Sequence, residues 1–251
     1  MTEYTTNIQK GGALLDDARL MVEAWDPALS TEENLHAVRD GDRLVKGTRS
    51  RAADVVLRVL RPRLVDPGAF VIEALRKVQS DPAAFADIVY FEAMRDDELL
   101  RDFATGPLYA HYTAGRSYVT VEDTLTWLAS LAEPRVRAWS ETVRMKVARG
   151  LLAALRDFGV LKGSVKKRFR APAMTNRGFA YAAWRLSREA GTDRVVFTTE
   201  LWRAWLLDPR RVEELVNQLD RCGVWSYSSA GSATRIDWRC DDIAEVLDAA
   251  A

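Results

Sequence analysis

The sequence contains little cysteine, glycine or proline, and it has no long apolar run. Its 251 residues include 2 cysteines, 14 glycines and 8 prolines, which excludes a disulfide framework and a collagen-like chain. No segment approaches about 18 consecutive apolar residues, so the hydropathy predicts no transmembrane helix and no membrane partner. The segment Met1–Asn7 lacks a basic region followed by an apolar one. We therefore expect no signal peptide, a cytoplasmic location and two free thiols.

The motifs of catalytic and metal chemistry are also missing. His36 and His111 lie far apart in the sequence, and Cys222 and Cys240 have no partner at the spacing of zinc ligands. No glycine-rich loop has the spacing of a nucleotide-binding site. No nucleophile, base and orienting residue form a recognisable set. We therefore expect a protein that is not an enzyme, with no catalytic residue, no cofactor and no metal.

The first half has the apolar spacing and capping residues of a helical bundle. A polar loop is expected between Gly41 and Gly47, and Ser50 is expected to cap the helix that follows it. The stretch 105–117 contains Gly106, Pro107 and Gly115, so it is expected to be a loop and a domain boundary. The expected helices cover residues 13–25, 30–39, 51–61, 67–78, a segment that begins at Asp81-Pro82, and 96–103.

The second half repeats one pattern, in which two helices are followed by a β-hairpin, as in a winged helix-turn-helix. The first copy has expected helices at 121–131 and 135–158 and a hairpin around the Lys162-Gly163 turn. The second has expected helices at 176–190, 200–207, 209–221 and 241–250 and a hairpin around 228–232. The sequence thus predicts a mainly α protein: an N-terminal helical domain (1–116) and two winged-helix-like units (117–173 and 174–251).

Charge is distributed very unevenly along the chain. The 36 basic and 36 acidic residues cancel overall, but residues 134–177 contain 12 basic and only 2 acidic residues. This segment carries a formal charge of +10 and the remainder −10, from the same sequence. A local excess of this size on a helix and hairpin favours a polyanionic partner.

The expected helix at 135–158 has an apolar face and a basic stripe, and a helix of this type fits the major groove of DNA. Basic residues of the following hairpin, the wing of the expected unit, are spaced closely enough to follow a phosphate backbone. The sequence therefore predicts binding of duplex DNA, mainly through phosphates. The candidate contacts are Arg137, Thr142, Arg144, Lys146, Arg149, Lys162, Lys166, Lys167, Arg168 and Arg170.

Three alternatives remain open. The basic residues could pair with acids of the first half, such as Asp96, Asp97 and Glu98, although exposed pairs contribute only about 0–1 kcal/mol each. The protein could instead be an RNA-binding helical module. It could also be an assembly adaptor whose basic face docks an acidic protein. The second unit has mixed charge, which favours a structural or protein-docking role, and its tryptophans are expected in the core: Trp184, Trp202, Trp205, Trp225 and Trp238.

Several short motifs along the chain resemble the BrxA family of BREX (bacteriophage exclusion) defence systems. They are Tyr4 with Gly11-Gly-Ala-Leu-Leu15, Lys46-Gly-Thr-Arg-Ser50, Leu60-Arg-Pro-Arg-Leu64, Leu99-Leu-Arg-Asp-Phe103, Trp139-Ser-Glu-Thr-Val-Arg144 and Leu155-Arg-Asp-Phe-Gly-Val-Leu161. The resemblance implies a helical, non-enzymatic protein with winged-helix-like parts, associated with double-stranded DNA and phage restriction. Other BREX proteins are possible partners. A likeness to the NusB antitermination fold, proposed for the family, would favour RNA. The resemblance supplies no catalytic residues.

Overall fold

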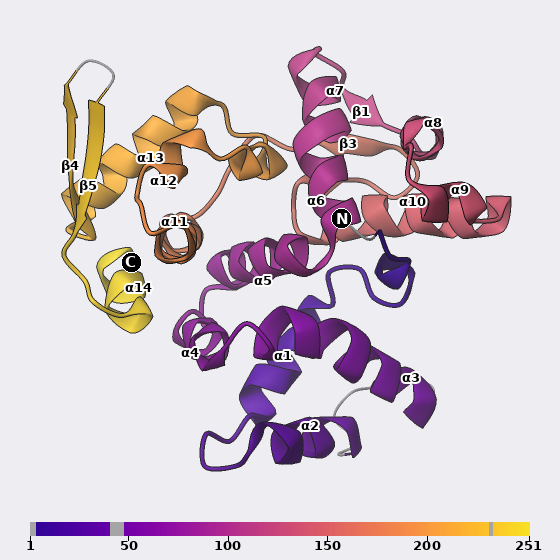
Figure 1. The fold of residues 1–251 in the computed structure, drawn as a ribbon, viewed down its shortest axis with the longest axis horizontal. Coiled ribbons are helices and arrows are strands. Elements are labelled where there is room, and N and C mark those ends of the chain that lie inside the picture. Colours follow the sequence, from indigo (N-terminus) through magenta and orange to yellow (C-terminus); the bar gives the residue numbers. More distant parts are fainter. Residues whose placement is uncertain (1–3, 41–47, 231–232) are drawn as a thin grey trace.

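Helices form most of the structure, which is a computed structural model describing residues 4–40, 48–230 and 233–251 (Figure 1). Two small antiparallel sheets complete it, so the expected mainly α fold with small hairpins is confirmed. The buried apolar side chains form one cluster that runs from Ile8 to Ala250. Within the described residues, no helix is both long and apolar enough to cross a bilayer. The polar loop expected between Gly41 and Gly47 lies outside the described residues.

The first part of the chain is a set of short helices, several of which begin where expected. Ser30 and Glu33 form a reciprocal cap at the start of α2: Glu33 N donates to Ser30 Oγ (3.3 Å) and Ser30 N donates to Glu33 Oε2 (2.8 Å). The elements are η1 (Asn7–Gln9), α1 (Leu15–Ala24), α2 (Thr31–Asp40), α3 (Arg49–Val55), the π-helical η2 (Val56–Val65) and α4 (Ala69–Lys77).

Two prolines lie inside helical segments where the sequence predicted an end or a loop. The helix expected at 51–61 is capped by Thr48 instead of Ser50, and it continues through Pro62 to Val65 as η2. The expected loop at 105–117 contains the π-helical η3 (Ala104–Leu108), which includes Pro107, and α7 (Tyr109–Thr113). Proline lacks the N–H that an α-helical hydrogen bond needs, and its ring clashes with the carbonyl group one turn before it. The wider π-helical turn relieves this clash.

Helix α5 (Pro82–Asp96) lies at the centre of the molecule, and ten of its fifteen residues are buried (Figure 1). Asp81 caps its first turn, as expected from the Asp-Pro pair. It packs against η2 on one side and α11 (Asn176–Ala190) on another, and α6 (Glu98–Phe103) follows it directly. Helix α5 therefore joins the N-terminal helices to the C-terminal part of the chain.

Residues 117–173, which include most of the basic segment, form three helices and a three-stranded sheet. Thr120 and Asp123 cap α8 (Val121–Ser130), which lies where a helix was expected at 121–131. The predicted hairpin is present, but a strand that was not predicted, β1 (Tyr118–Val119), pairs with its second strand, so the sheet order is β1-β3-β2. The remaining elements are α9 (Pro134–Ala138), α10 (Glu141–Asp157), β2 (Leu161–Lys162) and β3 (Lys167–Phe169).

The C-terminal part follows the predicted order of helices and hairpin. Trp225 pairs with Trp238, and Tyr227 with Ile236, across the second hairpin. Trp202, Trp205 and Trp225 are buried, whereas Trp184 and Trp238 are partly buried against the core. The helix expected at 200–207 is present only as the short 3-10 helix η4, and a short helix that was not expected, α12, precedes it. The elements after α11 are α12 (Val195–Thr198), η4 (Leu201–Trp205), α13 (Pro209–Cys222), β4 (Trp225–Ala230), β5 (Ala233–Trp238) and α14 (Ile243–Ala249). Cys222 and Cys240 are free thiols, as expected.

Two carboxylates on α5 are buried and connect it to the C-terminal part. Asp87 accepts hydrogen bonds from Thr175 N (2.8 Å), Thr175 Oγ1 (2.7 Å) and Trp205 Nε1 (2.8 Å). Glu92 accepts one from the hydroxyl of Tyr181 (2.6 Å). Because Thr175 is the N-cap of α11, Asp87 fixes the start of that helix against α5.

We predict that Asp87 makes the stability of the fold depend on pH. Burial raises the pKa of Asp87 from 3.8 to about 6, despite its hydrogen bonds to Thr175 and Trp205. The folded protein therefore keeps a proton on Asp87 over a pH range in which the unfolded chain releases it. The stabilisation from this group is fully present below pH 3.8 and is lost as the pH rises through about 6.

The measurement is urea unfolding of the wild type and Asp87→Asn between about pH 4 and pH 7. The free energy of unfolding of the wild type minus that of the variant should rise by up to about 3 kcal/mol as the pH falls, at roughly 1.4 kcal/mol per pKa unit. Glu213→Gln, which removes an exposed carboxylate, is the control. A difference that stays constant across this range contradicts the prediction.

Candidate nucleic-acid interface

The long helix predicted at 135–158 is broken into α9 and α10. Trp139 and Ser140 have extended backbone conformations, and Ser140 Oγ accepts a hydrogen bond from Val143 N (3.3 Å) as the N-cap of α10. Serine is a favoured N-cap residue, because its side chain satisfies an amide that the first turn leaves free. As a result, Arg135 and Arg137 lie on α9 and not on the basic stripe of α10.

Helix α10 presents a narrower basic stripe than the sequence predicted. Thr142, Lys146 and Arg149 are exposed and follow one another at helical spacing along one face. Arg144 is only partly exposed, and its Nη2 donates to the carbonyl of Arg137 (2.9 Å). Arg144 therefore joins α9 to α10, and it has less freedom to meet a ligand than the three residues of the stripe.

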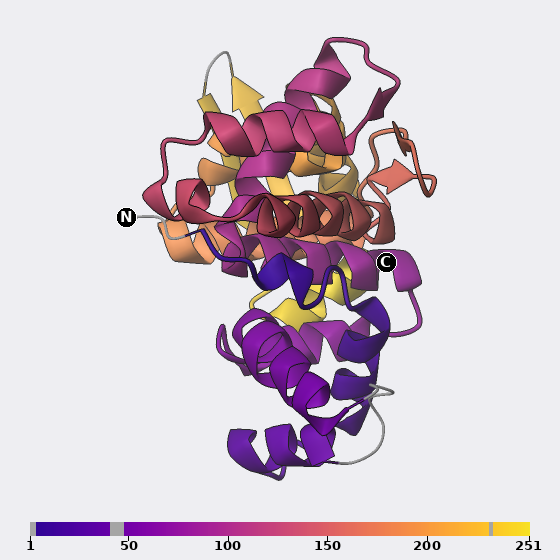
Figure 2. The same cartoon turned by 90° about the vertical axis from the view of Figure 1, so that its right-hand side faces the viewer.

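The β2–β3 hairpin lies beside the end of α10 (Figure 2). It carries further exposed cations. In β3, Arg168 pairs with Lys162 of β2 on one side and with Tyr118 of β1 on the other. Lys166 lies over the ring of Tyr118, with Nζ 5.5 Å from the ring centroid. We give the name basic face to seven exposed cations in or next to α9, α10 and the hairpin: Arg137, Lys146, Arg149, Lys162, Lys166, Arg168 and Arg170.

The cations of the basic face are not neutralised by neighbouring acids. Within residues 4–40, 48–230 and 233–251, the structure shows no ion pair for any of the seven. Arg156 is different, since it pairs with Asp157 (2.6 Å). The acids proposed above as partners are used elsewhere: Asp96 pairs with Arg63, Asp97 caps α6, and Glu98 pairs with Arg101. The alternative in which these three acids neutralise the hairpin is therefore wrong.

Lys167 was predicted as a phosphate contact, but the structure places it inside the hairpin. It is 7% exposed, and its Nζ donates to the carbonyls of Gly163 (2.9 Å) and Ser164 (2.7 Å). Burial and the nearby Arg156 lower the pKa of Lys167. Since side chains alternate along a strand, Lys166 and Arg168 point outward where Lys167 points inward. Lys167 holds the turn, and the basic face does not include it.

The N-terminal segment crosses α10 at a glycine. A Cβ atom on Gly150 would lie 3.1 Å from the carbonyl oxygen of Ile8, and one on Gly12 would lie 3.4 Å from Ala154. The cleft of about 510 Å³ between η1 and α10 is lined by Lys146 and Arg149 among others. Because the segment covers the middle of α10, this helix cannot lie along its full length in a DNA groove.

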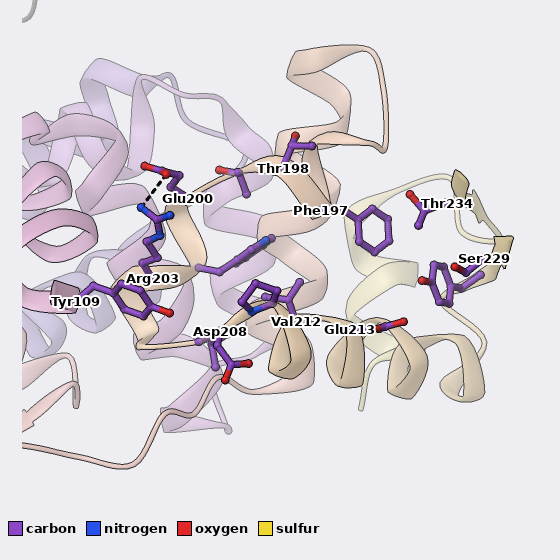
Figure 3. A pocket seen from close by; sticks show the side chains of 15 residues that line it. Tyr109, Phe197, Thr198, Glu200, Arg203, Asp208, Val212, Glu213, Ser229 and Thr234 are labelled. Carbon is purple, nitrogen blue, oxygen red and sulfur yellow. Dashed lines mark ion pairs between the residues drawn. The ribbon is translucent and has the colours of Figure 1, made fainter. Parts of the chain in front are cut away.

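A different cavity, of about 490 Å³, opens in the C-terminal part between α7, η4, α13 and the second hairpin (Figure 3). Glu200, Asp208 and Glu213 line it, and the one cation among the described lining residues, Arg203, is paired with Glu200 (2.7 Å). This acidic cavity repels a polyanion. Its lining residues include no histidine, cysteine or lysine, and the described residues contain no group of acids, histidines and cysteines that could hold a metal.

Sequence reasoning missed Tyr118 and Arg116, which border the hairpin. Arg116 falls in the stretch 105–117, which the sequence predicts to be a loop. Tyr118 lies in a two-residue strand, which is too short for its alternation to be detected. Tyr118 is 41% exposed, and at the hairpin tip Val165 is 89% exposed. The signal that could have found β1 is the aromatic and β-branched pair Tyr118-Val119 next to the cap at Thr120.

Comparisons with known proteins identify a family and a fold. The sequence model of the BrxA family matches residues 2–184. The crystal structure of an uncharacterized protein from Magnetospirillum magneticum is similar, with a TM-score of 0.60, 17% identity, and coverage of 81% of this chain and 98% of that one. At this identity the likeness shows a shared fold alone. No curated protein matches the sequence.

We predict that Lys167 has a structural role that its neighbour Lys166 does not share. Lys167→Met keeps the aliphatic stem but removes two charge-assisted hydrogen bonds, which are each of the order of 1.5–3 kcal/mol. Hydrogen exchange of the amides in 161–170 should then become at least about tenfold faster. Lys166→Met, as the matched control, should leave exchange unchanged. Equal effects of the two substitutions would disprove the assignment.

Proposed function

The chain belongs to the BrxA family, a component of BREX phage-defence systems, and from that premise we propose that it binds double-stranded DNA through the phosphate backbone. In general terms the family is a non-catalytic component, so binding is the activity to explain. We assign the contact to residues 117–173, through the basic face and Thr142, without Lys167. Other BREX proteins are the expected assembly partners.

The observation that carries the proposal is the set of seven exposed cations without ion pairs among the described residues. Repulsion between like charges held close together destabilises the free protein. Exposed ion pairs stabilise a fold only slightly, so pairing within the protein does not explain the charge. A polyanion removes this repulsion and releases counterions. The charge is therefore better explained by a ligand than by stability.

The order of elements supports a winged-helix interpretation of the same region. Helices α8 and α10 are followed by the β2–β3 hairpin, which would be the wing, and β1 adds a third strand to it. The N-terminal segment crosses α10 at Gly150, while Lys146, Arg149 and the cations of the hairpin remain exposed to a ligand. Contacts would therefore be mainly with phosphates, which position a protein on DNA without reading its sequence.

The test uses charge reversal at three residues of the basic face: Arg149→Glu, Lys166→Glu and Arg168→Glu combined. Fluorescence anisotropy with a duplex of roughly 20 base pairs is measured at several salt concentrations. If about five phosphates are contacted, the wild type should show a slope of log K against log salt of roughly −4 to −5. The variant should lose at least tenfold in affinity and about 0.9 of slope for each lost contact.

The matched control reverses three exposed arginines far from the basic face: Arg194, Arg210 and Arg221. It changes the net charge equally and should keep the wild-type slope. Unchanged binding by the first variant, or an equal loss in the control, overturns the proposal.

Competition with structured RNA of equal length separates DNA from RNA. Absence of nucleic-acid binding near physiological salt, with stable co-purification of other BREX proteins, would favour the adaptor function.

A further inference from the structure

A groove of about 800 Å³ lies beside the β2–β3 hairpin, between the hairpin and the end of α7. It is open along its length and is separate from the cleft on α10. One wall comes from α7 and the loop after it, and the other comes from the hairpin and the residues that follow β3. The residues that argue for a ligand are Tyr112, Arg116, Lys162, Arg168, Phe169 and Arg170.

The groove is strongly positive. Among the described residues, four cations line the groove and no carboxylate does. Arg116 is held in place by Asp123 (2.8 Å), whereas Lys162, Arg168 and Arg170 have no ion pair among the described residues. Arg170 N donates to the carbonyl of Val160 (3.0 Å), which fixes this residue beside the end of α10. An anionic chain is the complementary ligand.

Two aromatic rings accompany these cations. Tyr112 and Phe169 lie with ring centroids 5.6 Å apart and planes inclined at 58°, and both are partly exposed. Aromatic side chains stack on the faces of nucleic-acid bases, and a positive groove with such rings is typical of single-strand binding. In a duplex the faces of the bases are already covered by their neighbours. The rings therefore favour unpaired nucleotides.

We propose that this groove binds unpaired nucleotides of DNA next to a duplex held on the basic face. Lys162 and Arg168, a cross-strand pair of the hairpin, belong to both surfaces and make them continuous. The protein then recognises a junction between duplex and single strand: the basic face holds duplex phosphates, and Tyr112 stacks on a base of the emerging strand. This inference rests on the proposed function for the duplex part only.

The experiment compares three DNA probes by anisotropy: a blunt duplex, the same duplex with a short single-stranded tail at either end, and the tail strand alone. The tailed duplex should bind about tenfold more tightly than the blunt one. Tyr112→Leu should remove most of this gain without changing blunt-duplex affinity, and Tyr112→Phe should keep it, because the gain depends on stacking. A 2-aminopurine in the tail should lose fluorescence on binding to the wild type but not to Tyr112→Leu.

A matched control and a second variant distinguish a loss of base stacking from a loss of folding. Tyr227→Leu removes a partly exposed aromatic ring that is stacked on Phe197 in the acidic cavity, and it should leave all three affinities unchanged. Thr113→Glu puts a negative charge at an exposed position on the groove and should weaken binding of the tailed duplex and of the tail strand, but not of the blunt duplex.

The outcomes separate the two proposals. Equal affinities for tailed and blunt duplexes, with no change in 2-aminopurine fluorescence, overturn the groove assignment and leave duplex binding intact. Loss of blunt-duplex binding with retained, Tyr112-dependent binding of the single strand supports the groove and overturns the proposed function. An effect of Tyr227→Leu equal to that of Tyr112→Leu also overturns the groove assignment. Failure to bind any probe overturns both.

Discussion

The arrangement of the whole molecule depends on two carboxylates buried on the central helix α5. A buried carboxylate is costly unless hydrogen bonds compensate for the lost water, so Asp87 and Glu92 restrict how the C-terminal part can pack. Asp87 is bonded at once to the start of α11 and to Trp205 of η4, and Glu92 is bonded to Tyr181. A Cβ on Gly178 would lie 2.5 Å from that of Asp87, so glycine alone permits this approach. A shift of α11 by one turn would break the contacts that Thr175, Gly178 and Tyr181 make with α5.

Arginine and lysine side chains have opposite roles in this structure, depending on whether they are buried or exposed. Arg63 is buried, pairs with Asp96 and donates to the carbonyl of Gly12 (2.8 Å), which ties the N-terminal segment to η2. Lys167 likewise binds carbonyls inside the hairpin. Their cationic groups act as internal donors, whereas Lys166 and Arg168 remain in water. Structural cations hold the segments that present the basic face, so the density of charge in the sequence overstates the number of cations open to a ligand.

The sequence predicts well those features that depend on a few neighbouring residues. The caps at Ser30, Asp81 and Thr120 and both hairpins follow from local hydrogen bonding and side-chain alternation. The features that the sequence does not predict are places where one segment can adopt either of two backbone conformations. Pro107 predicts the end of a helix, but the π-helical η3 accommodates it. The segment from Arg135 to Phe158 has the pattern of one helix, but Ser140 caps a new helix within it. The inward position of Lys167 requires the register of β3, which adjacent basic residues cannot reveal.

Helix α7 separates two surfaces of opposite charge, and this follows from its unusual exposure. None of its five residues is buried, so both of its sides are available. Tyr112 faces the positive groove and Tyr109 the acidic cavity, with ring centroids only 6.4 Å apart. Arg203 lies over Tyr109 at 5.6 Å but is paired with Glu200, so it adds little positive potential there. If the groove binds an unpaired DNA strand as proposed, the acidic cavity would repel that strand on the far side of α7, and this repulsion would set the direction in which the strand leaves the hairpin.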